Sequence, residues 1–373
     1  MDALTTPSNW QRVRLGDIGK PCMCKRVMKH QTTRYGEIPF YKIGTFGNTA
    51  DAFISKKLFL EYKTKYSFPK KGDILISASG TIGRAVIYDG KPAYFQDSNI
   101  VWIDNDETLV KNDFLFYAYS NIKWNTEHTT ILRLYNDNFR NTLIPLPPLN
   151  EQIAIANVLS DVDHYLYSLD ALILKKEGVK KALSFELLSQ RKRLKGFNQA
   201  WQRVRLGDIA NYLTSNLSAE QITQQGKIKV YDVNNFIGYT DIAFISDKPY
   251  ISIVKDGSVG RVRILPPKTN ILSTMGALIA NHKTTTEFLF YLLSNFDFKN
   301  FTSGSIIPHI YFKDYKEKTI FLPPLNEQIA IANILSDLDN EIISLKNKKR
   351  QFENIKKALN HDLMSAKIKV LNK

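Results

Sequence analysis

The sequence predicts an α+β protein in which two pseudo-symmetric domains, β-rich with mixed α/β content, are separated by two long antiparallel coiled-coil helices. Three observations predict this fold: an internal repeat, a heptad-like spacing of apolar side chains after each repeat, and short β-branched runs in between. The chain has 373 residues, enough for two or three domains of ordinary size. Its hydrophobic content of 43% is typical of globular proteins with buried cores.

Two segments of the sequence occur twice and divide it into two copies of one pattern. WQRVRLGDI opens each copy, at residues 10–18 and 201–209, and LPPLNEQIAIAN closes each copy, at residues 146–157 and 322–333. The bodies between these segments share only traces, such as SGTIGRAVI in the first copy and DGSVGRVRI in the second. The pattern predicts one fold used twice with different surface chemistry.

A long helix is predicted after each closing segment. Pro147 and Pro148 end the preceding segment, and Asn150 is the predicted N-cap. Apolar side chains then recur at steps of four and three residues, the spacing of a coiled-coil seam, over about 34 residues or about 50 Å. The seam residues are Ile155, Leu159, Val162, Leu166, Leu169 and Ile173, and in the second copy Ile331, Leu335, Leu338, Ile342, Leu345, Phe352, Leu359 and Leu363.

The two helices are expected to pair with each other. Each body connects the end of one helix to the start of the other, which requires an antiparallel pair with the bodies at opposite ends. Lys176 and Lys180 interrupt the first seam, so packing is expected to be more hydrated there, and Gly178 lowers helix stability by about 1 kcal/mol relative to Ala. The alternative is a pair of ordinary amphipathic core helices, but their length favours the seam.

The bodies have the composition of short strands followed by a helix. GDILISAS at residues 72–79 and IVWID at residues 100–104 are β-branched runs bounded by Gly, Pro and Asp. A helix is predicted from NDFLFYAYSN in the first body and TEFLFYLLSN in the second.

The charge of the chain favours a polyanionic partner. Lys and Arg number 51 against 36 Asp and Glu, a formal net charge of +15. DNA or RNA comes first, because phosphate contacts dominate nucleic-acid affinity. An anionic membrane is the alternative, but no apolar run approaches the roughly 20 residues of a membrane span. We therefore expect a cytoplasmic protein that binds no membrane.

Cys22 and Cys24 are the two cysteines, too few for a disulfide scaffold. With His30 they make a poor metal site, because three ligands in one short segment lack the second pair of a tetrahedral centre. We interpret both as free thiols and expect no metal site.

Motifs for catalysis do not stand out. There is no G-x-x-x-x-G-K-[ST] phosphate loop, no Asn-Pro-Pro-aromatic tetrapeptide and no G-x-G-x-x-G motif after a strand. Gly80 and Gly83 lie in a G-x-x-G-R pattern that recurs at Gly257 and Gly260, so we interpret it as a shared structural turn. The Arg that follows each turn could reach a phosphate or a guanine edge.

Taken together, these motifs resemble the specificity subunits of type I restriction–modification systems. The resemblance covers essentially the whole chain and depends most on the duplicated closings IPLPPLNEQIAIANVLSDVD and IFLPPLNEQIAIANILSDLD. It implies target recognition domains at residues 1–145 and 196–321, each reading half of a split, asymmetric DNA sequence. It also implies conserved spacer helices at residues 146–195 and 322–373, which set the gap between the two halves.

The resemblance implies a non-catalytic subunit that works with partners. Two methyltransferase subunits would dock on the conserved helical region and bring S-adenosylmethionine, and motor–nuclease subunits would complete the complex. ATP and Mg²⁺ are likewise expected on those partners, so no cofactor is expected to bind this chain directly. The stretch before the closing differs between the copies, TTILRLYNDNFRNT against TSGSIIPHIYFKDY.

The candidate site residues are polar side chains on the turns and on the segments before the closings. No catalytic or metal-ligating residue is predicted. The DNA-binding candidates are Lys42, Thr45, Ser79, Thr81, Arg84, Arg133, Asn136, Asn138, Asn234, Lys255, Ser258, Arg261, Ser303, Ser305 and His309. The candidates for partner docking are Asn150, Glu151, Gln152, Asn326, Glu327 and Gln328.

Three alternatives stay open on the sequence. One is a methyltransferase or nuclease with unrecognised motifs, which a cofactor-binding assay would distinguish. Another is a coiled-coil interaction scaffold without a nucleic-acid role, against which the charge argues. The third is the specificity subunit of a related multi-subunit DNA-modifying defence system.

Overall fold

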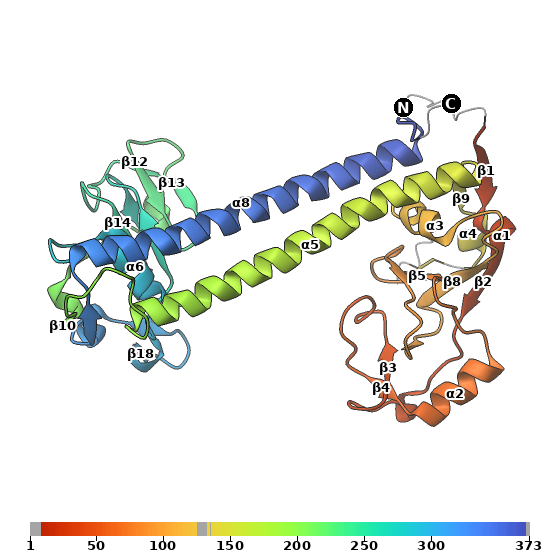
Figure 1. The fold of residues 1–373 in the computed structure, drawn as a ribbon, viewed down its shortest axis with the longest axis horizontal. Coiled ribbons are helices and arrows are strands. Elements are labelled where there is room, and N and C mark those ends of the chain that lie inside the picture. The colour runs from red at the N-terminus through yellow and green to blue at the C-terminus, as the bar shows by residue number, and fades with distance from the viewer. Residues whose placement is uncertain (1–8, 125–132, 135, 371–373) are drawn as a thin grey trace. The chain divides into compact units, whose positions relative to one another are not determined.

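The computed structural model describes residues 9–124, 133–134 and 136–370 (Figure 1). The chain divides into two compact units. Unit 1 consists of Met1–Leu169 together with Lys348–Lys373, and unit 2 consists of Asp170–Asn347. Helices α5 (Leu149–Leu188) and α8 (Leu325–Met364) both run through the two units, so each unit contains one part of each helix.

In unit 1 a four-stranded sheet of order β2-β8-β5-β6 adjoins a three-stranded sheet of order β4-β3-β7, and β1 pairs with β9. The elements are β1 (Gln11–Arg14), α1 (Leu15–Ile18), β2 (Gly19–Met23), η1 (Lys29–Gln31), β3 (Ile38–Tyr41), β4 (Phe53–Ile54), α2 (Lys56–Lys65), β5 (Ile74–Ser77), β6 (Ala85–Ile87), β7 (Tyr94–Phe95), β8 (Ile100–Asn105), α3 (Asn112–Tyr119), α4 (Asn136–Asn141) and β9 (Leu143–Leu146).

Unit 2 repeats this topology, with sheets β11-β17-β14-β15 and β13-β12-β16 and the pair β10-β20; it also has a small hairpin, β18-β19. The elements are β10 (Gln202–Arg205), η2 (Leu206–Asp208), β11 (Ala210–Thr214), η3 (Ala219–Gln221), β12 (Ile228–Tyr231), β13 (Phe236–Thr240), β14 (Tyr250–Val254), β15 (Val262–Leu265), β16 (Asn270–Ile271), β17 (Met275–Ala280), α6 (Thr286–Ser294), η4 (Lys299–Phe301), β18 (Thr302–Ser303), β19 (His309–Ile310), α7 (Phe312–Tyr315) and β20 (Thr319–Leu322).

One inner strand of each larger sheet, β5 in unit 1 and β14 in unit 2, is buried on both faces. Side chains of a strand alternate between faces, so Ile74 and Ile76 of β5 pack in one core, with α3, while Leu75 packs in a second core with the three-stranded sheet. In unit 2, Ile251 and Tyr250 of β14 divide in the same way. This two-sided burial explains why GDILISAS is a nearly continuous apolar run, and it confirms the predicted pair of related α+β domains.

The repeated opening segment of each unit pairs with the strand directly before the repeated closing segment. β1 and β9 are antiparallel, with Gln11 opposite Leu146, and β10 and β20 have the same register, with Gln202 opposite Leu322. Each opening segment therefore pairs with the strand that leads into its own closing segment and ends on the first residue of that segment. The two ends of each body are thus held together by one two-stranded pair.

The helix segments are antiparallel in both units. In unit 1, Tyr165 of α5 lies against Phe352 of α8, with ring centroids 4.6 Å apart. In unit 2, Lys176 of α5 pairs with Glu341 of α8 at 2.7 Å. Of the predicted seam residues, Ile155, Leu159, Leu169, Ile173, Ile331, Leu335, Ile342 and Leu363 are buried, which confirms the seam.

Two details of the helix prediction were wrong. Each helix has 40 residues instead of about 34, because both begin before their first seam residue and α5 also continues past Ile173 to Leu188. Asn150 is not the N-cap, since α5 already begins at Leu149, and the Pro148 carbonyl accepts hydrogen bonds from the backbone N–H groups of Glu151 and Gln152. The seam lysines form interhelical ion pairs, Lys176 with Glu341 and Lys180 with Asp339.

Candidate nucleic-acid interface

The two glycine turns are built alike. All four glycines have positive φ, from +64° at Gly80 to +84° at Gly83 and Gly257, so each occupies a backbone conformation that other residues rarely adopt. A Cβ at Gly83 would lie 2.0 Å from Nε1 of Trp124, and one at Gly260 would lie 2.7 Å from the Phe298 ring. These contacts confirm that the G-x-x-G pattern is a structural turn.

In each unit the segment before the closing strand lies against this turn. In unit 1 the backbone N–H of Leu134 donates to the Ala78 carbonyl at 2.8 Å, and Arg133 forms a β-bridge with Ser79. In unit 2 the N–H of Ile310 donates to the Lys255 carbonyl at 2.9 Å, and a β-bridge joins His309 to Asp256. We call these assemblies the turn clusters: residues 78–84 with 133–134 in unit 1, and 255–261 with 303–310 in unit 2.

The turn clusters present different side chains on one scaffold. In unit 1, Arg133 donates from Nη2 to the Ser98 carbonyl at 3.0 Å, and the Ser79 hydroxyl donates to Oδ1 of Asn99 at 2.8 Å. In unit 2, Nδ1 of His309 lies 2.6 Å from Oδ1 of Asp256. The divergent stretches before the closings therefore place Arg133 and His309 at equivalent positions.

Other candidates from separate segments meet at these clusters. In unit 1, exposed Thr81 and Arg84 lie on the turn, and Nη2 of Arg84 is 3.5 Å from both the Gly47 carbonyl and Oδ1 of Asn48. The loop that follows β3 carries Lys42, which pairs with Asp51, and Thr45, whose hydroxyl accepts from the Lys42 N–H.

The unit 2 turn cluster includes Lys255, Ser258, Arg261, Ser303, Ser305 and His309, and its Ser258, Arg261, Ser303 and Ser305 are exposed. Sequence reasoning missed Arg263, whose Nη1 donates to the Asn234 carbonyl at 2.9 Å while its guanidinium lies 5.3 Å from the Tyr231 ring centre. The alternation R-V-R-I could have indicated it, because side chains two residues apart in a strand share a face.

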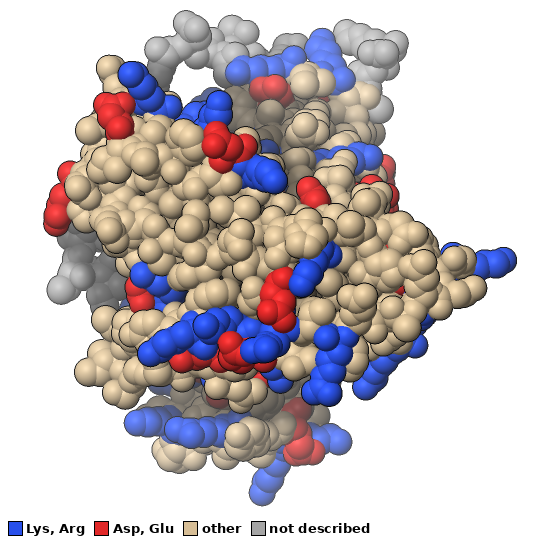
Figure 2. Space-filling model, turned by 90° about the vertical axis from the view of Figure 1, so that its left-hand side faces the viewer, with Lys and Arg blue, Asp and Glu red and all other residues tan. Residues whose placement is uncertain are grey.

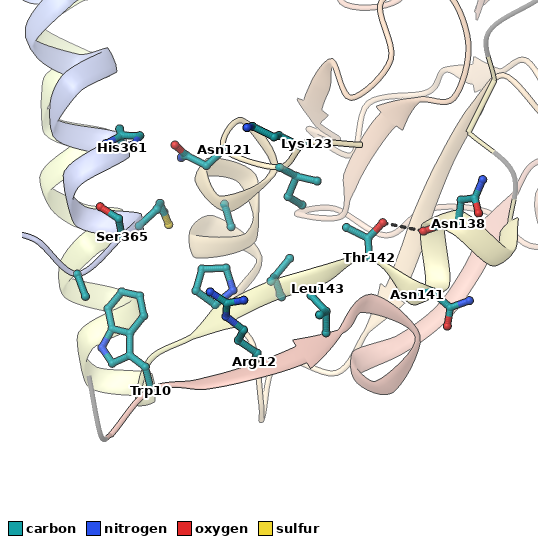
Figure 3. A pocket seen from close by; sticks show the side chains of 16 residues that line it. Trp10, Arg12, Asn121, Lys123, Asn138, Asn141, Thr142, Leu143, His361 and Ser365 are labelled. Carbon is teal, nitrogen blue, oxygen red and sulfur yellow. Dashed lines mark hydrogen bonds between the residues drawn. The ribbon is translucent and has the colours of Figure 1, made fainter. Parts of the chain in front are cut away.

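Asn136 and Asn138 lie on α4, outside the two turn clusters. Asn138 lines an open hollow of about 650 Å³ in unit 1, between β1, β9, α3 and the end of α8 (Figure 3). The basic side chains of Arg12, Lys123 and His361 also line it, together with polar Asn121 and Ser365. None of its lining residues, all of them described, is a carboxylate.

The docking candidates divide into buried and exposed side chains. Gln152 is buried, where its amide accepts from the Lys111 N–H and donates to the Leu109 and Pro147 carbonyls. Gln328 is also buried and accepts hydrogen bonds from Thr284 and the Thr285 N–H. These glutamines fix the start of each helix to its unit.

The glutamates join the repeated closing to the repeated opening. Nε1 of Trp10 donates to Glu151 at 3.1 Å, and Nε1 of Trp201 donates to buried Glu327 at 2.9 Å. Arg193 adds an ion pair to Glu327 at 2.7 Å. Among the docking candidates, Asn150 and Asn326 are exposed.

Charged side chains are grouped on the face that Figure 2 draws. In Figure 2, Lys and Arg side chains gather in groups, several with Asp or Glu beside them, and broad uncharged areas lie between. Exposed ion pairs such as Arg205–Glu317, at 2.7 Å, bring opposite charges together on the surface.

The cysteines are free thiols, as predicted. Burial raises the pKa of Cys24 to about 12 and also raises the pKa of the partly buried Cys22, so both favour the protonated form at neutral pH.

Within the described part of the chain, no group of three or more His, Cys, Asp or Glu side chains could hold a metal ion. No described helix is both long and apolar enough to cross a bilayer.

Both halves of the sequence match one known protein family. The type I restriction modification DNA specificity domain matches this sequence twice, over residues 7–176 and 198–354. The chain belongs to this family. It is a specificity subunit with two DNA recognition domains, and the two matches coincide with the two copies of the internal repeat.

One relative that matches the whole chain and one that matches part of it are both named as specificity subunits. The type I restriction enzyme MjaVIII specificity subunit of Methanocaldococcus jannaschii is 26% identical over 416 residues, covering 100% of this chain and 96% of that protein. A Haemophilus influenzae protein named as a specificity subunit, S.HindORF215P, is 63% identical over 148 residues, which are 39% of this chain and 38% of that protein.

Solved structures support the fold. The S subunit of the type I restriction–modification system from M. genitalium superposes with a TM-score of 0.63 at 20% identity, covering 96% of this chain and 97% of that one. A chain from a structure of type I restriction–modification complex assembly gives a TM-score of 0.57 at 16% identity, covering 96% of this chain and 98% of that one.

Proposed function

We propose that this specificity subunit reads a bipartite, asymmetric DNA sequence, one half with each unit, and that it has no catalysis of its own. The observation that carries the proposal is the pair of turn clusters. One backbone scaffold appears in both units, but the side chains at its bridge are Ser79 and Arg133 in one and Asp256 and His309 in the other. Because base edges are distinguished by their donor and acceptor patterns, different side chains on one scaffold would read different bases.

Two methyltransferase subunits are the proposed partners on the helices. Leu149, Ile153 and Tyr167 of α5 are exposed apolar residues, and Leu325, Ile329 and Ile343 occupy the corresponding positions of α8. Leu149 and Tyr167 lie on one side of α5, because 18 residues are five turns of about 3.6 residues. An apolar surface that occurs twice suits two copies of one partner.

The partners would supply the chemistry. We propose that S-adenosylmethionine is held by the methyltransferase subunits and that ATP and Mg²⁺ are held by motor–nuclease subunits in the full complex. Such a complex acts on DNA and would work in the cytoplasm.

The test is to map the methylation of DNA modified by this chain with its cognate methyltransferase. We expect two short, different half-sequences separated by a fixed number of unspecified base pairs. A single contiguous recognition sequence would contradict the bipartite reading. The purified chain alone, supplied with S-adenosylmethionine or Mg²⁺, is expected neither to methylate nor to cut the same DNA, and turnover there would contradict the non-catalytic role.

A further inference from the structure

One carboxylate in each unit joins three helical segments. In unit 1, Oδ2 of Asp163 on α5 accepts the Tyr117 hydroxyl of α3 at 2.8 Å, and Oδ1 forms an ion pair with Lys356 of α8 at 2.5 Å. In unit 2, Oδ2 of Asp339 on α8 accepts the Tyr291 hydroxyl of α6 at 2.9 Å, and Oδ1 pairs with Lys180 of α5. We call each Tyr–Asp–Lys set a joint.

The joints are equivalent to the atom. Asp163 and Asp339 occupy the same position after the repeated closing, as do Lys180 and Lys356, and the tyrosines belong to the matching FLFYAYSN and FLFYLLSN helices. The ammonium of each Lys also lies over the Tyr ring, 5.5 Å from its centre in unit 1 and 5.8 Å in unit 2. Each joint therefore holds three elements through an ion pair, a charge-assisted hydrogen bond and a cation–π contact.

The neighbouring layer of the helix pair shows that such identity is not required for pairing. There unit 1 has Tyr165 against Phe352, whereas the corresponding positions in unit 2 are Glu341 and Lys176, which form an ion pair. An aromatic contact occupies that layer in one unit and an ion pair occupies it in the other. The joint, by contrast, keeps all three residues although the bodies around it diverge.

The tyrosines make the joints more than helix-to-helix contacts. Tyr117 and Tyr291 are nearly fully buried, and α3 and α6 pack against the larger sheet of their units, which also carries the turn cluster. In unit 1, Asn360 of α8 adds hydrogen bonds to the Ser120 hydroxyl and the Tyr117 carbonyl. The recognition body of each unit is thus tied to both helices at one place.

We propose that the two joints are positioning devices that fix each recognition body on the helices and so determine how strictly the protein distinguishes the gap between half-sites. This inference rests on the proposed bipartite reading. A body held rigidly engages its half-site only at one spacing, because displacement of the second half-site requires the joint to deform. A loosened joint lets the same body reach half-sites at neighbouring spacings, which raises the effective concentration for wrong gaps.

The experiment uses the full chain and duplexes carrying the mapped target with its native gap or with a gap one base pair longer or shorter. Tyr117→Phe and Tyr291→Phe, singly and together, remove only the hydroxyl that reaches α5 or α8. Tyr88→Phe is the matched control, since the Tyr88 ring is also buried in unit 1 but its hydroxyl donates to the Lys91 carbonyl within the same body. Lys356→Gln tests the joint through its other partner.

We expect the double variant to bind the native-gap target within about threefold of wild type. Its preference for that target over the shifted gaps should fall about tenfold, the scale of one hydrogen bond to a charged group. Lys356→Gln should act in the same direction, and Tyr88→Phe should leave the preference unchanged. Three results would overturn the proposed role of the joints: an unchanged gap preference in the joint variants, an equal loss of gap preference in Tyr88→Phe, or a uniform loss of affinity for every target. If the wild-type chain binds half-sites at any gap, the proposed bipartite function is contradicted, and the role proposed for the joints is contradicted with it.

Discussion

At the residue level, the side chains that differ between the two turn clusters come from segments that are distant in the chain. Position 133 meets position 79 in unit 1, and position 309 meets position 256 in unit 2, yet neither pair lies in a periodic pattern. Periodicity reports which face of an element is buried, so it predicted the seam and the strands but not which loops meet. The Arg after each turn could be selected because it is the same residue in both copies, whereas the residue before each turn differs, Ser79 in one copy and Asp256 in the other.

Arg84 and Arg261 are expected to contact DNA phosphates. Both are exposed at the same position of equivalent turns. Replacement of either by Ala should weaken binding to specific and unrelated duplexes alike, and should reduce the slope of log K against log salt by about one unit. Equilibrium binding of the full chain at several salt concentrations measures this. A salt slope equal to that of wild type for both variants would leave these arginines a structural role only.

Buried tyrosines are expected to limit stability at alkaline pH. Burial raises the pKa of Tyr88 and of Tyr250 to about 12, above the value near 10 of an unfolded chain. The folded state holds these protons more tightly, so their contribution is complete below about pH 10 and is lost as the pH rises toward 12. The melting temperature should fall across this interval and fall less steeply in Tyr88→Phe. A melting temperature that stays level to pH 12 would contradict the assignment.

At the level of elements, the helices could be predicted because their seam repeats over many turns. Ile155, Leu159, Ile331 and Leu335 are buried as the spacing indicates. Gln152 and Gln328 were interpreted as docking candidates from their place in a repeated segment, but both are buried against their own units. A repeated polar residue can serve the fold or a partner, and only the three-dimensional contacts distinguish the two.

The helices are expected to act as a ruler. Seven residues inserted into both helices, after Leu169 in α5 and before Lys348 in α8, preserve the heptad phase of the seam and lengthen each helix by about 10 Å. The preferred gap should grow by about three base pairs at 3.4 Å each. Methylation mapping with the cognate methyltransferase measures the gap. A gap that stays the same in a folded insertion variant would show that the helices do not set it.

At the level of the whole molecule, both units contain the same set of contacts between distant segments. The opening strand pairs with the closing strand in one register, a Trp reaches the first-turn Glu of the following helix, and a buried Gln fixes that helix to its body. The sequence repeat predicted this duplication, since identical segments form identical contacts. The identity of the base that each body reads could not be predicted, because it depends on side chains that differ between the copies.

These shared contacts predict that the bodies are interchangeable. We expect a chimera in which residues 19–145 are replaced by residues 210–321 to fold, because the exchanged segment carries its own half of each contact. Gly19, for example, packs so closely on Asp104 that a Cβ would lie 2.3 Å from its carbonyl oxygen, but Asp104 leaves with it and Ala210 arrives with Ala280 as its strand partner. The joint is kept too, since Tyr291 takes the place of Tyr117.

The chimera should recruit the same methyltransferase and modify a palindromic site built from the second half-sequence alone. Methylation mapping with the cognate methyltransferase tests this, and circular dichroism with thermal melting establishes that the chimera is folded. The reciprocal chimera, with the first body in both positions, is the matched control and should give a palindrome of the first half-sequence. A folded chimera that retains an asymmetric target would place specificity outside the bodies, in the segments that both units share.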